Sequence, residues 1–118
     1  MTLPRAIAFG AATAWWIGAG SSALAQAMPV TATYICERGV EVPVSYTTPE
    51  QGEPTAVLYV ENRMVTLVRT RAASGARYAW PSDGSGYVWW TKGDTATLFW
   101  HDAAAEEDVT LYAACQAR

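Results

Sequence analysis

The sequence predicts an all-β domain, a small antiparallel barrel of eight strands with one disulfide. From Val30 onward, apolar and polar residues alternate with a period of two, and no segment keeps the spacing of an amphipathic helix. Clusters of turn-forming residues divide this pattern into eight short segments. Eight short antiparallel strands can close into a barrel that their own side chains fill. A two-sheet sandwich is the alternative that periodicity leaves open.

The N-terminal segment, residues 1–25, is expected to be a secretory signal peptide. Arg5 precedes an apolar run, and small residues lead up to Ala25. A membrane-spanning helix is the alternative, but polar and small residues interrupt the run, and a span needs about 20 predominantly apolar residues. Cleavage would leave Gln26 first, with no cysteine there to take a lipid. We therefore expect residues 26–118 to form one exported domain without a membrane anchor.

The expected strands follow one another through short links. They cover residues 31–36, 40–46, 55–60, 63–69, 75–80, 86–91, 95–101 and 109–115. The links carry turn-forming residues and cover residues 37–39, 49–54, 61–62, 72–74, 81–86, 93–94 and 102–108. In three of these strands the alternation is regular enough to assign a core face. The residues expected on the core face are Val40, Val42, Val44 and Tyr46 in the first of them, Ala96, Leu98 and Trp100 in the second, and Val109, Leu111, Ala113 and Cys115 in the third.

Two cysteines, Cys36 and Cys115, stand near the two ends of the expected domain. In an oxidising compartment an even pair of cysteines indicates a disulfide. A reactive thiol pair is the alternative, but the Cys-x-x-Cys spacing typical of one is absent from the sequence. A bridge that closes so long a loop would stabilise a small domain considerably.

The charge pattern restricts the class of partner. The chain has a formal net charge of −3, and its few cations are scattered along the sequence. A nucleic acid is not expected as a partner, because binding a phosphate backbone requires clustered lysine and arginine. An acidic domain favours a basic protein partner.

The sequence lacks the motifs of catalysis and of metal binding, so we expect no enzyme, cofactor or metal. His101 is the only histidine, and the sequence contains neither a zinc-type cluster nor a nucleophile elbow nor a phosphate loop. The consecutive acids at 106–108 lack the alternating spacing of a calcium loop. A glycosidase-type pair of carboxylates leaves no mark in a sequence, so that enzyme alternative stays open.

Four tryptophans lie beyond the expected signal peptide, and two of them, Trp89 and Trp90, are adjacent in an expected strand. Neighbouring residues in a strand face opposite ways, so one indole points into the core and the other outward. An outward tryptophan suits a stacking platform for sugars or a protein contact. A glycan- or peptidoglycan-binding module is therefore an alternative function.

Two short polar loops, Ser74–Tyr78 and Thr91–Asp94, carry a more specific signal. With Trp90 before the second loop, and flanked by Tyr34-Ile35-Cys36 and by Cys115, they resemble the family of bacterial inhibitors of C-type lysozyme. The resemblance spans essentially residues 26–118. It implies a small antiparallel β-barrel that blocks the muramidase cleft, a C-type lysozyme as partner, and, without a lipid-bearing cysteine, a free periplasmic protein.

The resemblance also assigns residue roles. The serine before the glycine of the first motif and the lysine of the second are inhibitory in that family, and they correspond to Ser74 and Lys92. The supporting loop residues would be Gly75, Ala76, Arg77, Tyr78, Thr91, Gly93 and Asp94. The sequence leaves open whether the domain is a monomer or a homodimer.

The chemistry of the residues agrees with these roles. Lysine carries a compact charge on a thin stem, and an ammonium beside two carboxyl groups favours ionisation of both. Gly93 stands at the first position of an expected two-residue hairpin turn, a position that favours glycine. The Ser74 hydroxyl can donate a hydrogen bond to a carboxylate. Ser74 and Lys92 are 18 positions apart, yet consecutive antiparallel strands would bring both to one rim, with residues 81–86 at the opposite rim.

Overall fold

The computed structural model describes residues 10 and 28–118. The expected signal peptide, residues 1–25, lies outside the described residues apart from Gly10, so it stays a prediction. No helix in the described part of the chain is long and apolar enough to cross a membrane.

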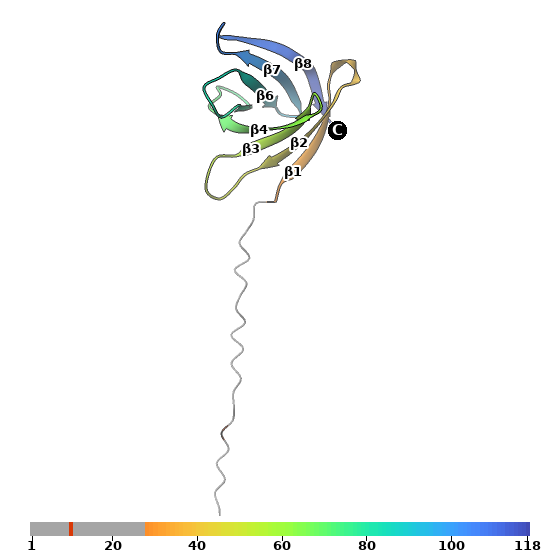
Figure 1. Cartoon of the computed structure of the whole chain (residues 1–118). Helices are drawn as coiled ribbons and strands as arrows, with labels where there is room; N and C mark the ends of the chain where they lie inside the picture. The colour runs from red at the N-terminus through yellow and green to blue at the C-terminus, as the bar shows by residue number, and fades with distance from the viewer. Residues whose placement is uncertain (1–9, 11–27) are drawn as a thin grey trace, which may run out of the picture.

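The described chain folds into a closed barrel of eight antiparallel strands (Figure 1). The strands are β1 Val30–Ile35, β2 Glu41–Thr47, β3 Thr55–Val60, β4 Arg63–Thr70, β5 Ala76–Ala79, β6 Gly86–Lys92, β7 Thr95–Asp102 and β8 Glu107–Ala117, with one short 3₁₀ helix, η1 Glu37–Gly39. Each strand pairs with its successor, and the end of β8 pairs with β1 to close the ring. The predicted barrel is confirmed, and the sandwich alternative is wrong.

The core fills the barrel with side chains from all eight strands. Trp89, Leu58, Leu67, Leu98 and Val42 are completely buried there. Such close packing explains why the alternating pattern predicts the strands so well, because only one face of each strand can enter the interior.

Aromatic hydroxyl and indole groups in the core hydrogen-bond to one another. The hydroxyls of Tyr34 and Tyr46 lie 2.7 Å apart, and the Trp89 Nε1 donates to the Tyr46 oxygen at 2.9 Å. Burial raises the pKa of Tyr46 above its ordinary value. Within the described residues, no buried side-chain nitrogen or oxygen lacks a hydrogen-bond partner. These bonds offset the cost of enclosing polar atoms in the barrel.

The predicted disulfide between Cys36 and Cys115 is confirmed. Cys36 follows β1, and Cys115 faces inward from β8, opposite Ala96 of β7. Both cysteines are buried. The bridge therefore ties the first strand to the last beside the seam where the barrel closes.

Two predicted core residues, Trp100 and Val109, are exposed by 36% and 48%. They pair with each other across β7 and β8, and the Trp100 ring meets that of buried Tyr87 edge-on at 5.1 Å. Both belong to the inward-facing rows of their strands. They lie near the barrel end where β7 turns into β8, so the interior covers them only in part.

The predicted core face of β8 is only partly right: Leu111 packs against the core and Cys115 is buried as predicted, but Tyr112 joins them. Leu98 pairs with Tyr112, a residue expected on the outer face, and Tyr112 packs against the core. The register of β8 against β7 shifts twice between Ala96 and Phe99. Each shift adds a residue to β8, and one extra residue reverses which face the following side chains occupy.

Candidate functional site

The two predicted loops lie on the same rim of the barrel. The loop that ends with Ser74 and Gly75 leads into β5, and the turn after Lys92 ends β6. These strands pair antiparallel, with Ala76 opposite Thr91. The start of β5 therefore adjoins the end of β6, whereas the link between the two strands lies at the other end of the barrel.

Lys92 stands at the edge of a tight two-residue turn made of Gly93 and Asp94. Lys92 pairs with Thr95 across the turn, and Gly93 has a φ of 61°. The Thr95 hydroxyl donates to the Lys92 carbonyl at 2.9 Å, and the Ala117 amide donates to the Asp94 carbonyl at 2.8 Å. Because these bonds hold the turn, the exposed Lys92 side chain projects from a fixed backbone.

Gly75 packs the first loop against the second. Its φ is 66°, and a Cβ built on it would lie 2.1 Å from the Thr91 carbonyl oxygen and 2.9 Å from Cγ of Lys92. No other residue fits so close to the neighbouring backbone at this φ without distortion. Gly75 therefore sets the distance between the two loops.

Replacing Gly75 with alanine is expected to lower the free energy of unfolding by about 1–2 kcal/mol, because the new methyl group strains both φ and the contact with Thr91. Urea denaturation followed by tryptophan fluorescence measures the change. Gly84→Ala is the matched control, since a Cβ there meets nothing within 4 Å and its φ is not positive. Equal stability of the two variants would contradict the role given to Gly75.

Trp90 connects the two loops. Its Nε1 donates to the Ser74 carbonyl at 2.9 Å, and the Lys92 Nζ lies 5.3 Å from the centre of its ring. The Arg77 Cζ lies 6.0 Å from the same ring. Trp89 is fully buried while Trp90 is half-buried, which confirms that one of the adjacent indoles faces inward and the other outward. The sequence predicts an outward indole here but not its contacts with both loops.

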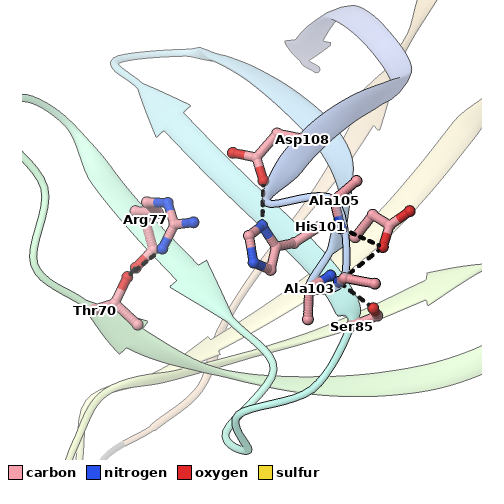
Figure 2. Close-up of polar contacts among 9 residues, drawn as sticks. Thr70, Arg77, Ser85, His101, Ala103, Ala105 and Asp108 are labelled. Carbon is pink, nitrogen blue, oxygen red and sulfur yellow. Dashed lines mark hydrogen bonds and ion pairs between the residues drawn. The ribbon is translucent and has the colours of Figure 1, made fainter.

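The remaining supporting residues belong to the strands. The Thr91 hydroxyl donates to the Ala76 carbonyl at 3.3 Å, and Tyr78 is buried with its ring against that of Tyr46. Arg77 of β5 turns toward β4, and its Nη1 donates to the Thr70 hydroxyl at 3.1 Å (Figure 2). The polar side-chain partner of Arg77 is thus a hydroxyl rather than an acid.

His101 and Asp108 form a pair of their own, away from the two loops. The His101 Nδ1 lies 2.7 Å from the Asp108 Oδ1, bridging β7 and β8 beside the turn that joins them (Figure 2). The described residues contain no group of three or more histidine, cysteine, aspartate or glutamate side chains that could hold a metal ion.

Lys92 and Arg77, two cations on the loop rim, take part in no ion pair within the described residues. Within residues 28–118, the ion pairs are His101 with Asp108 and Arg118 with Glu41. The interactions of the two cations among the described residues are with the Trp90 ring, and for Arg77 also with the Thr70 hydroxyl. This arrangement can bind an anionic group of a partner without first breaking an ion pair within the domain.

A family model matches most of the barrel. The family model described as membrane-bound lysozyme-inhibitor of c-type lysozyme matches residues 34–107. A membrane-bound lysozyme inhibitor of C-type lysozyme from Cupriavidus necator is 38% identical over 86 residues, which cover 72% of this chain and 63% of the relative. A protein of the same description from Pseudomonas aeruginosa is 35% identical over 66 residues, 56% of this chain and 49% of the relative. The chain thus spans about half to 63% of these relatives.

Two solved structures share the fold. A periplasmic lysozyme inhibitor of C-type lysozyme from Salmonella typhimurium superposes with a TM-score of 0.63 and 26% identity, covering 77% of this chain and 99% of its own. The inhibitor MliC from Pseudomonas aeruginosa, in complex with hen egg white lysozyme, superposes with a TM-score of 0.55 and 26% identity, covering 100% of this chain and 99% of its own.

Proposed function

We propose that this chain inhibits a C-type lysozyme with the rim that carries Ser74 and Lys92. The premise of this proposal is that the chain belongs to the family of membrane-bound lysozyme inhibitors of C-type lysozyme. The observation that carries the proposal is that the two loops pack side by side and present the exposed Lys92 ammonium. This ammonium forms no ion pair with an acid of the described residues. Two solved structures that superpose on this barrel are described as lysozyme inhibitors, and one of them was solved in complex with hen egg white lysozyme.

The chemistry of the enzyme's cleft favours a lysine at this position. A lysozyme needs one carboxyl group protonated as an acid and a second one ionised. The Lys92 ammonium beside these groups would favour the ionised form of both, and its thin stem would occupy the space of the substrate. The exposed Ser74 hydroxyl would donate a hydrogen bond to a carboxylate oxygen from the adjoining loop.

We propose a periplasmic location for the inhibitor. Relatives include a protein described as periplasmic and others described as membrane-bound. Gln26, rather than a cysteine, follows the expected cleavage site, which favours the free form. The acidic domain would also be steered toward a basic lysozyme, so association should slow as the salt concentration rises.

The contacts of Trp90 weaken the case for a glycan-binding module. A stacking platform needs an open aromatic face. The Trp90 ring already has the Lys92 and Arg77 cations over it, and its Nε1 is bonded to the Ser74 carbonyl. The outward indole is therefore better suited to supporting the loops than to receiving a sugar.

Competition kinetics tests the proposed function. We expect the inhibitor to raise the apparent KM of a C-type lysozyme for a soluble chitin oligosaccharide and to leave kcat unchanged, because inhibitor and substrate would occupy one cleft. Initial hydrolysis rates over a matrix of substrate and inhibitor concentrations give both parameters. The enzyme concentration is kept below the dissociation constant and the inhibitor in excess over the enzyme. Under these conditions a fall in kcat at constant KM would place the inhibitor outside the cleft and contradict the proposal.

A further inference from the structure

We propose that Trp90 is a positioning residue that holds Ser74 and Lys92 in one binding geometry before a partner arrives. The inference rests on the proposed function, because it assigns to Trp90 the orientation of the two groups that are to enter the lysozyme cleft. Trp90 itself need not touch the lysozyme. It acts through two contacts, one to each loop.

The first contact fixes the Ser74 loop. The Trp90 Nε1 donates at 2.9 Å to the Ser74 carbonyl, a group 16 positions earlier in the chain. Ser74 precedes the first residue of β5 by two positions, so the β5–β6 ladder does not hold its carbonyl. The last residue pair of the ladder is Ala76 with Thr91. The indole hydrogen bond therefore adds a link between β6 and the loop before β5, beyond the end of the ladder.

The second contact holds the Lys92 side chain. Residues two apart in a strand face the same side of the sheet, so Lys92 and Trp90 project together from β6. The Lys92 Nζ lies 5.3 Å from the ring centre, within the range of a cation–π interaction. A free lysine side chain samples many rotamers and loses that freedom on binding, and a side chain held beforehand loses less.

The two contacts depend on each other through the packing of the loops. Gly75 brings its backbone against Thr91 and the Lys92 side chain, so a displaced Ser74 loop would also displace Lys92. Arg77 lies over the same ring from the neighbouring strand, at 6.0 Å, and its own Nη1 is bonded to Thr70 of β4. The indole is therefore supported from β4 and β5 as well as from its own strand.

Two substitutions separate the contacts. Trp90→Phe keeps an aromatic ring beneath Lys92 and removes the N–H, and we expect inhibition to weaken about fivefold. Trp90→Leu removes both contacts, and we expect about a tenfold loss or more. Trp80→Leu is the matched control, since Trp80 is 44% exposed and lies beside the β5–β6 link at the opposite rim. Its inhibition constant should stay within about twofold of wild type.

NMR of the free protein provides a readout that a purely structural role would not move. The indole ring should shift the Lys92 side-chain protons upfield in wild type, and this shift should vanish in Trp90→Leu while the core methyl signals stay in place. In a Lys92→Ala background, Trp90→Leu should cost less than in wild type, because the contact with Lys92 is already gone.

The outcomes distinguish this inference from the function on which it rests. If Lys92→Ala loses inhibition while Trp90→Leu inhibits as wild type or better, Trp90 does not position the pair, and the inhibitory rim stands without it. Stronger inhibition by Trp90→Leu would show that the indole restrains Lys92 in an unproductive position. If Lys92→Ala inhibits as wild type does, the proposed function fails together with this inference.

Discussion

Replacing Lys92 with alanine is expected to weaken the inhibition of a C-type lysozyme by about 1.5–3 kcal/mol, or roughly 10- to 150-fold, the scale of charge-assisted hydrogen bonds. Lys92 is exposed at a turn that three backbone and side-chain contacts hold in place, and no acid of the described domain pairs with it. Removing the ammonium should therefore remove contacts to the partner and leave the fold intact. Isothermal titration of lysozyme with each variant gives the change in binding free energy.

Two further variants make this result specific. Ser74→Ala should weaken binding by less than Lys92→Ala, because it removes one neutral donor and leaves the charge. Arg63→Ala removes an exposed cation at the start of β4, on the rim opposite to the loops, and should leave affinity unchanged within about 0.5 kcal/mol. Equal losses for Lys92 and Arg63 would mean that only the overall charge matters.

Breaking the Cys36–Cys115 bridge is expected to lower the free energy of unfolding by about 2–5 kcal/mol. The bridge joins residues 79 positions apart, so the unfolded chain gains considerable freedom without it. It also ties β1 to β8, two strands that share few paired residues. The double variant C36A/C115A should therefore unfold at a clearly lower urea concentration than the oxidised protein.

Reduction of the wild-type protein provides the control for the loss of two buried sulfur atoms. Dithiothreitol should lower the urea midpoint of wild type toward that of C36A/C115A and leave the double variant unaffected. If the oxidised and reduced wild-type proteins unfold at the same urea concentration, the bridge contributes nothing to stability and the account of the barrel seam is wrong.

Most of the fold could be predicted from the sequence because a barrel interior accepts one face of each strand. The alternation of Val42 and Val44 with polar neighbours, and the tight turn at Gly93, locate strands and hairpins directly. The strand ends and bulges could not be predicted in this way. Trp100 belongs to the inward row but lies near the end of the barrel, and Tyr112 faces the core because β8 gains residues relative to β7.

The candidate site could be predicted in outline but not in its internal contacts. Counting strands between Ser74 and Lys92 is enough to bring both to one rim, since direction alternates in an antiparallel sheet. The bond from Trp90 to the Ser74 carbonyl depends on a rotamer and on a loop outside the ladder. Neither the rotamer nor the loop conformation leaves a periodic signal in the sequence. From the sequence alone, an outward indole is therefore as consistent with a stacking surface for sugars as with a residue that supports the loops.

A turbidity assay tests the central claim most directly. A C-type lysozyme clears a suspension of bacterial cell walls, and the clearing rate is followed with increasing amounts of the purified domain, residues 26–118. We expect the clearing rate to fall in proportion to the amount of added domain. When the lysozyme concentration exceeds the dissociation constant, inhibition should be complete near one inhibitor per enzyme. An unchanged clearing rate at a large molar excess of folded, oxidised domain would contradict the account.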